Sequence, residues 1–160
     1  MDATTKAYIA GFLDGDGCIM FQLVYRHDYL YGYQVRASLV FYQKTNNRFI
    51  LEWLKSKLHR GYIRNRNDGM SEYTIVGIKP VLEILKRLQP FLRLKKKHAQ
   101  LAKSIGALLP YYKKIDIKTL LKAAKLVDKF KELNYSKKRT NTSIKVSNFL
   151  KEKGYIPCND

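Results

Sequence analysis

Alternating apolar and polar positions predict strands in the first half of the chain. Across residues 33–43, aromatic and aliphatic side chains occupy every second position, which is the period of a strand with one buried face. A weaker alternation over residues 18–26 predicts a neighbouring strand, joined by a polar and aromatic hairpin loop at residues 27–32. A second hairpin is predicted over residues 60–77, because Asn-Asp-Gly at 67–69 is a strong turn signal.

Helical patterns surround these strands. Thr4 or Thr5 can cap a first helix that runs to about Leu13, and Asn46 or Asn47 can cap a second helix. Further helices are predicted from Pro80 to Pro90 and over residues 95–109, 117–133 and 143–153. The order α-β-β-α-β-β-α plus C-terminal helices predicts an α+β fold, with a curved four-stranded antiparallel sheet and helices packed on one of its faces.

The length and the charge fit one domain that binds a polyanion. We expect a single domain over residues 1–160, with a core at about 4–133 and a basic helical tail at about 134–160. There are 31 Lys and Arg against 13 Asp and Glu, a formal charge of +18, which attracts nucleic acid. A membrane surface is the other candidate anion, but no apolar run approaches the roughly 18 residues of a membrane span, and the start lacks a secretory signal.

Cysteine and histidine offer no metal site and no disulfide framework. Cys18 and Cys158 are the two cysteines, too few for a framework and without metal-site spacing. The three histidines are scattered along the chain. Cys18 is expected to be a small buried residue, and the chain is typical of a reduced, intracellular protein.

The stretch Tyr8–Gly17, Y-I-A-G-F-L-D-G-D-G, combines small residues with two acids. Three small residues recur at one-turn intervals, at Ala7, Gly11 and Gly15, and such a stripe lets another helix approach closely. Asp14 and Asp16 are expected where the helix ends, because the glycines beside them are poor helix formers. The pattern predicts a metal-binding carboxylate at a helix interface; the alternative is a Gly/Asp-rich turn after a buried helix.

One face of the predicted sheet is rich in long polar side chains. Its members are Gln22, Arg26, Gln34, Arg36, Tyr42, Arg64, Arg66 and Glu72. Solvated sheet faces tend to carry Lys, Glu and Thr, whereas this one carries Arg and Gln, which pair with guanine and adenine in the major groove. The pattern favours base reading over a plain solvated face. Val24 and Val40 share the face and either contact a thymine methyl or fill space.

The motif and four downstream segments resemble the single-motif branch of the LAGLIDADG homing endonucleases, over about residues 5–142. The segments follow in the same order, as Q-K-T at 43–45, I-K-P at 78–80, L-Q-P-F-L at 88–92 and L-K-K-K at 94–97. The resemblance implies a site-specific DNA endonuclease that makes a metal-dependent double-strand break. It also implies a homodimer, because one motif per chain supplies one cut, and hence a long, nearly palindromic site.

Roles for individual residues follow from that resemblance. Asp16 and the Gly15 carbonyl would bind Mg²⁺ or another divalent cation such as Mn²⁺, with Ca²⁺ binding but not supporting cleavage. Gln43 would order the attacking water, and Lys95 would place a cation near the scissile phosphate. The alternatives are a groove-facing glutamine and an ordinary lysine at a helix start. Asp14 is interpreted as a structural acid that binds backbone donors at the turn of the motif.

The resemblance also assigns contact surfaces. The dimer interface would comprise Ala7, Gly11, Phe12 and Gly15. Base contacts would come from Gln22, Arg26, Gln34, Arg36, Tyr62, Arg64, Arg66 and Glu72. Phosphate contacts are expected off the sheet, from Lys44, Arg48, Lys96, Lys97, Lys137, Lys138 and Arg139. The chain departs from its relatives at Asn47, where they carry a basic residue, so cleavage is expected to be slower unless Arg48 or Lys44 substitutes.

Two other functions fit parts of the pattern. A non-cleaving nucleic-acid-binding module, either an RNA maturase for intron splicing or a DNA-binding regulator, would keep the scaffold, but the presence of Asp16, Gln43 and Lys95 favours cleavage. A basic membrane-surface protein would use an amphipathic helix such as residues 117–133, which packing on the core explains more simply. We expect double-stranded DNA and a second copy of the chain as partners, no membrane and no small-molecule substrate, in an organelle or a microbial cytoplasm.

Overall fold

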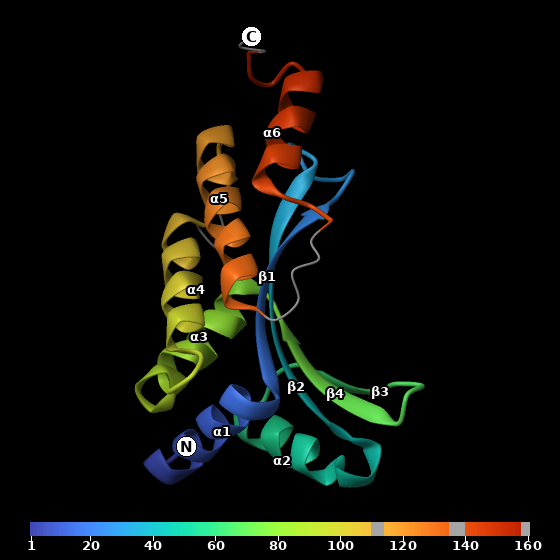
Figure 1. The fold of residues 1–160 in the computed structure, drawn as a ribbon, viewed down its shortest axis with the longest axis vertical. Helices are drawn as coiled ribbons and strands as arrows, with labels where there is room; N and C mark the ends of the chain where they lie inside the picture. The colour runs from blue at the N-terminus through green and yellow to red at the C-terminus, as the bar shows by residue number, and fades with distance from the viewer. Residues whose placement is uncertain (110–113, 135–139, 158–160) are drawn as a thin grey trace. The chain divides into compact units, whose positions relative to one another are not determined.

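A computed structural model describes residues 1–109, 114–134 and 140–157. The elements are α1 (Ala3–Asp16), β1 (Gly17–Tyr25), β2 (Tyr33–Lys44), the 3₁₀ turn η1 (Thr45–Asn47), α2 (Phe49–Leu58), β3 (Tyr62–Asn65), β4 (Met70–Val76), α3 (Ile78–Leu88), the 3₁₀ turn η2 (Gln89–Phe91), α4 (Lys96–Leu108), α5 (Ile117–Leu133) and α6 (Ser143–Glu152) (Figure 1). The strands form one sheet in the order β1-β2-β4-β3. The predicted α+β class with a four-stranded antiparallel sheet is confirmed.

The chain divides into two compact units, each built from two segments of the sequence. The first unit contains residues 1–20 and 37–100, and the second contains residues 21–36 with the chain from residue 101 onward. Strands β1 and β2 therefore each contribute to both units. The expected division into a core at 4–133 and a tail at 134–160 stays a prediction.

The first unit places helices α1, α2 and α3 with the β2–β4 pair. The antiparallel register runs from Ser38 opposite Val76 to Lys44 opposite Met70. Phe41 stacks on Tyr73 across that pair, with ring centroids 5.9 Å apart and planes 16° apart, and both side chains are fully buried. The predicted turn at 67–69 is confirmed, since Gly69 adopts a φ of 77° that other residues rarely adopt.

The second unit packs the far end of the β1–β2 hairpin with α5 and α6. Helix α5 buries one face at helical spacing, through Leu120, Ala123, Ala124, Val127 and Phe130. The Phe130 ring stacks on Phe21 of β1, with centroids 5.1 Å apart. Helix α6 begins at the cap residue Thr142, whose hydroxyl accepts a hydrogen bond from the Lys145 amide. None of the helices within the described residues is long and apolar enough to cross a bilayer.

Two helix starts differ from the prediction. The cap of α1 is Asp2, whose carboxylate accepts a 2.8 Å hydrogen bond from the Thr5 amide, so the expected cap at Thr4 or Thr5 is wrong. The Asp2 carboxylate also accepts a 2.8 Å hydrogen bond from the Thr5 hydroxyl, and Thr4 and Thr5 lie inside the first turn of the helix. The expected cap of the second helix at Asn46 or Asn47 is wrong too, because both lie in η1 and α2 begins without a side-chain cap.

The end of α1 lies further along the chain than predicted. The helix was expected to end near Leu13, but it continues through Asp16. The Gly17 amide donates to the Leu13 carbonyl and so keeps the helical pattern past Gly15. The penalty for glycine in a helix is only about 1 kcal/mol, which one continued turn can offset. The two acids of the motif are therefore helical residues, and Asp16 is the last of them.

Candidate active site and nucleic-acid interface

Helix α1 presents Asp16 at its C-terminal end. The side chain is exposed, and within the described residues no hydrogen bond or ion pair engages its carboxylate. Gly15 is also exposed, and a Cβ added there would meet nothing within 4 Å. The last carbonyls of a helix lack intrahelical partners, so a free carboxylate and carbonyl oxygens lie together, which is the donor type that Mg²⁺ prefers. The described residues hold no cluster of three or more His, Cys, Asp or Glu that could hold a metal ion.

Asp14 holds two distant parts of the chain together. Its carboxylate accepts backbone hydrogen bonds from Arg93 at 2.6 Å, Leu94 at 3.1 Å and Lys95 at 2.9 Å. The interpretation of Asp14 as a structural acid is confirmed. The prediction that the donors lie at the turn of the motif is wrong, because the observed donors lie 79–81 positions further along the chain. The carboxylate thereby satisfies amide donors immediately before α4.

Lys95 is docked on the helix end that carries Asp16. Only 8% of the residue is exposed, and its Nζ donates a 2.6 Å hydrogen bond to the Asp14 carbonyl oxygen. Burial lowers the pKa of Lys95, against the opposing effect of the nearby carboxyl groups of Asp14 and Asp16. An ordinary lysine at a helix start would be solvated, so that alternative does not fit this buried position. Beside it, Cys18 is half-buried rather than buried, and burial raises the pKa of its thiol.

Gln43 lies near the end of β2, opposite Ser71 of β4. Because side chains alternate along a strand, it shares a face with Phe41 and not with Tyr42. The alternative interpretation as a groove-facing glutamine therefore does not fit. Its side-chain oxygen accepts a 2.8 Å hydrogen bond from the Lys44 amide, which leaves its NH₂ group to donate elsewhere.

Three predicted base contacts, Arg64, Arg66 and Glu72, form one ion-pair cluster in the β3–β4 hairpin. The register puts Tyr42, Glu72 and Arg64 in one row across three strands. Glu72, whose side chain is only 12% exposed, binds Arg64 at 2.8 Å and lies 4.0 Å from Arg66, and Arg66 also binds Asp68 at 2.7 Å. The two arginines are exposed while the Glu72 carboxylate is mostly covered, so the arginine side of the cluster is open to a ligand.

The remaining base-contact candidates lie on separate elements. Gln22 and Arg36 are exposed and Gln34 is half-buried, all in the second unit, while the exposed Tyr62 lies in the first unit on β3. Arg26 follows the end of β1, where it binds Asp28 through two 3.0 Å hydrogen bonds and lies over the Tyr29 ring.

The two valines on the predicted reading face differ in exposure. Val40 is 3% exposed, so it fills space, and its neighbour Ser38 on the same face is 5% exposed. Val24 of β1 is half-buried. The reading face is therefore interrupted by packed positions along β2, which the alternation alone did not indicate.

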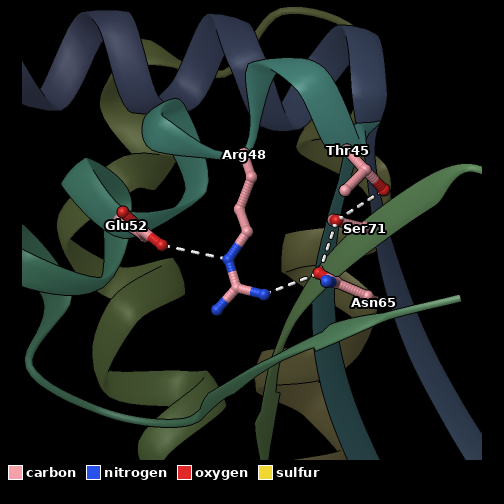
Figure 2. Close-up of polar contacts among 5 residues, drawn as sticks. All are labelled: Thr45, Arg48, Glu52, Asn65 and Ser71. Atoms are coloured by element: carbon pink, nitrogen blue, oxygen red, sulfur yellow. Dashed lines mark hydrogen bonds and ion pairs between the residues drawn. The ribbon is translucent and has the colours of Figure 1, made fainter.

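The phosphate-contact candidates differ in whether their charged groups already bind another side chain. Lys44, Lys96 and Lys97 are exposed, whereas the Arg48 guanidinium binds Glu52 at 3.0 Å and Asn65 at 2.6 Å (Figure 2). Asn65 lies on β3, at the sheet edge opposite β1, and Asp16 immediately precedes β1. Whether Lys44 or Arg48 substitutes for the basic residue missing at Asn47 stays a prediction. Lys137, Lys138 and Arg139 lie outside the described residues.

The small-residue stripe on α1 is open surface. Ala7, Gly11 and Gly15 are exposed, and a Cβ added at either glycine meets nothing within 4 Å. Phe12 differs from them, because it is half-buried and its ring packs against Phe41 with centroids 6.0 Å apart. Tyr8, 50% exposed, lies beside it with ring centroids 6.4 Å apart.

Sequence reasoning missed the polar side chains behind the β3–β4 hairpin. Thr45, Ser71 and Asn65 form a hydrogen-bonded chain that ends on Arg48 (Figure 2). Thr45 belongs to the Q-K-T segment, which is the single sequence signal near them. No periodicity marks Asn65, because its role depends on strand pairing.

Comparison with known proteins agrees with this geometry. A sequence model described as LAGLIDADG endonuclease matches residues 9–108. The chain is 44% identical over 155 residues to "DNA endonuclease I-CvuI" of Chlorella vulgaris, covering 97% of this chain and 95% of that protein. It is 39% identical over 136 residues to "DNA endonuclease I-CreI" of Chlamydomonas reinhardtii, covering 85% and 82%. The chain therefore belongs to the LAGLIDADG endonuclease family.

Solved structures extend the similarity to the fold. A crystal structure of I-CvuI in complex with its target in the presence of Ca matches with a TM-score of 0.89 and 43% identity, covering 96% of each chain. An archaeal intron-encoded homing endonuclease complexed with DNA, I-Vdi141I, matches with a TM-score of 0.82 at 18% identity. At that identity the second match supports the fold alone.

Proposed function

We propose that this protein is a site-specific DNA homing endonuclease. It makes a metal-dependent double-strand break, as a homodimer, in a long and nearly palindromic duplex site. The observation that carries this proposal is the exposed Asp16 carboxylate at the end of α1, with Lys95 docked two residues earlier on the Asp14 carbonyl. Family membership supports it, since I-CvuI and I-CreI are named DNA endonucleases.

The residues at the end of α1 fit a divalent cation. Asp16 and the Gly15 carbonyl would hold Mg²⁺ or Mn²⁺, and Ca²⁺ would bind without supporting cleavage. The bound cation would offset phosphate charge and activate water. Lys95 adds a second positive charge, and its anchorage on Asp14 keeps that charge near Asp16. Gln43 uses its free NH₂ group to orient the attacking water.

The homodimer explains how one motif per chain cuts two strands. Two α1 helices pack along Ala7, Gly11 and Gly15, where nothing within 4 Å blocks the glycine positions. A two-fold axis between the helices brings two Asp16 side chains together. Each chain then supplies one Asp16 carboxylate, two in all for the two cuts, and the palindromic site matches the symmetry of the dimer. Phe12 supports the helix from within its own protomer.

DNA recognition divides between the sheet and its surroundings. Arginine and glutamine side chains of the sheet read base edges, with Arg64 and Arg66 released from Glu72 on binding. Lys44, Lys96 and Lys97 neutralise phosphates and set the register without reading sequence. The protein needs access to duplex DNA, so we place it in an organelle or a microbial cytoplasm.

Cleavage of supercoiled plasmids tests this function. Plasmids would carry a library of near-palindromic sites, including the two duplexes, Sro1.3 and C1221, that occur in I-CvuI complexes. We expect linear product from at least one site in Mg²⁺ and none in EDTA. Tight, site-specific binding with no cutting in Mg²⁺ or Mn²⁺ would instead support the non-cleaving alternative, a maturase or a regulator.

A further inference from the structure

A continuous chain of hydrogen bonds runs behind the β3–β4 hairpin (Figure 2). The Thr45 hydroxyl lies 3.0 Å from the Ser71 hydroxyl, and Ser71 donates to the Asn65 side-chain oxygen at 2.9 Å. Arg48 donates to the same oxygen at 2.6 Å and to Glu52 at 3.0 Å. Four segments of the first unit, namely η1, α2, β3 and β4, are thereby joined through side chains.

Donors and acceptors in this series of hydrogen bonds can be assigned in one consistent order. Ser71 has one hydroxyl proton and gives it to Asn65, so Thr45 must be the donor to Ser71. The Asn65 oxygen accepts from both Ser71 and Arg48, as the two lone pairs of a carbonyl allow. Reversing the Asn65 amide would bring its NH₂ group against the Arg48 guanidinium, which can only donate. Because Ser71 is fully buried, loss of either bond would leave a polar group without compensation from water.

The side chains of this hydrogen-bond network lie beside two groups of residues with proposed roles, namely Gln43 and the arginines of the hairpin. Thr45 follows Gln43 by two positions, and Ser71 lies directly opposite Gln43 in the strand register. Asn65 lies between Arg64 and Arg66, and Glu72, the next residue after Ser71, binds Arg64. Because side chains alternate along strands, the hydrogen-bonded side chains occupy one face of the hairpin and the arginines occupy the other.

We propose that Thr45, Ser71 and Asn65 are positioning residues that fix Gln43 relative to the hairpin that reads the DNA. When Arg64 and Arg66 bind their bases, they set the position of the end of β2. That strand end carries Gln43, whose amide orders the attacking water. This inference rests on the endonuclease function proposed above. It adds a coupling between recognition and the rate of cleavage, and it assigns that coupling to residues that touch neither the reacting atoms nor the bases.

The test separates the rate of cleavage from affinity. Single-turnover cleavage at saturating enzyme would be measured in Mg²⁺, and the dissociation constant would be measured in Ca²⁺, on the duplex that the wild type cleaves fastest. For Thr45→Val and Asn65→Leu we expect the rate constant to fall about ten- to a hundred-fold, the cost of a misplaced catalytic group. We expect the dissociation constant to change less than about three-fold, because Asn65 and its partners lie on the face of the hairpin opposite Arg64.

Conservative variants and a matched control sharpen the test. Thr45→Ser keeps the donor hydroxyl, and Asn65→Asp keeps the acceptor oxygen beside Arg48, so both should cleave within about three-fold of the wild type. Ser56→Ala is the matched control, because it removes an exposed hydroxyl that binds only the Trp53 carbonyl of its own helix. Asn65 is exposed, so Asn65→Leu should fold even if substitution of the buried Ser71 does not.

Each outcome decides the inference. Cleavage by Thr45→Val and Asn65→Leu at the rate of Ser56→Ala would overturn it, and so would a loss that lies entirely in the dissociation constant. A rate that falls in these two variants and recovers in Thr45→Ser and Asn65→Asp would support it. A wild type that cuts no duplex would remove the proposed function and this inference together, whereas a cutting wild type with unaffected variants would remove this inference alone.

Discussion

The two hairpins of the sheet are held by different kinds of contact. Behind β3–β4, hydrogen bonds connect Thr45, Ser71 and Asn65, and ion pairs hold the arginines in front. At the tip of β1–β2, in the second unit, the Phe149 ring of α6 packs edge-on against Tyr25 and Tyr33, with centroids 5.7 Å and 5.4 Å apart. The first arrangement depends on donors and acceptors, and the second depends on volume and shape.

Chain geometry at the β1–β2 tip reinforces this packing. Gly32 has a φ of 69°, and a Cβ added there would come within 2.5 Å of the Phe149 ring. The Tyr155 hydroxyl donates a 3.1 Å hydrogen bond to the Leu30 carbonyl, and its ring contacts Tyr31. Substitutions should therefore act differently in the two regions, through lost volume at the β1–β2 tip and through lost hydrogen bonds and charges at the β3–β4 hairpin.

The largest expected effect is that of Phe149→Ala. Removing a half-buried ring that contacts two tyrosines should lower the free energy of unfolding by about 3 kcal/mol, the low end of the range for phenylalanine deletions. Chemical denaturation measures it. Phe149→Leu, which keeps most of the volume, should lose less than about 1.5 kcal/mol. Equal stability of Phe149→Ala and the wild type would show that aromatic packing does not hold this tip.

Arg64→Ala tests the charged side of the other hairpin. If Arg64 reads a base, the variant should lose roughly 1–3 kcal/mol of binding free energy and relax specificity at one position in each half-site. Titration against duplexes changed one base pair at a time measures both. Lys97→Ala provides the contrast, because a phosphate contact should weaken binding to every sequence alike. A uniform loss in Arg64→Ala would make that arginine a phosphate contact too.

Glu72→Gln should have a smaller effect on stability, below about 1 kcal/mol, because its ion pairs are with exposed arginines. Its effect on DNA should be larger. Removing the negative charge frees Arg64 and Arg66 for any phosphate, so affinity for non-cognate duplex should rise several-fold and specificity should fall. Unchanged affinity for a non-cognate duplex would mean that Glu72 does not restrain the arginines.

The smallest expected effect comes from salt. At about 1 M salt the Debye length falls to about 3 Å, which weakens ion pairs and leaves apolar packing intact. Amide hydrogen exchange at residues 62–76 should quicken modestly in high salt, while exchange at residues 30–33, which lie outside the Arg26–Asp28 ion pair, should not. Equal acceleration in both segments would remove the distinction between the two hairpins.

The sequence predicted those parts of the fold that depend on local patterns. The bounds of α5 agree with the prediction because its apolar residues recur at helical spacing, and the turn at 67–69 carries its own chemistry. The predicted end of α1 was wrong, because one glycine lowers helix stability less than the continued hydrogen bonds raise it. Contacts between distant segments, such as Asp14 with residues 93–95 and Thr45 with Ser71, could not be predicted, because they depend on how the elements pack.

The same division holds for the candidate site. Asp16 and the arginines of the sheet carried signals in the motif and in the alternation, whereas the burial of Lys95 and of Val40 emerged only with the fold. Residue type and spacing identify side chains whose functional groups suit binding or catalysis. The surrounding packing decides which of them are fixed, which are free and which are covered.

Plasmid cleavage by Asp16→Asn tests whether this carboxylate holds the cation that cleavage needs. The variant keeps the shape of the side chain but loses the charge that would hold the cation, so we predict that it binds the cognate duplex and makes no break in Mg²⁺. A dimer of one wild-type and one Asp16→Asn chain should cut far more slowly than the wild type or nick a single strand. Double-strand cleavage by Asp16→Asn at the wild-type rate would contradict the account.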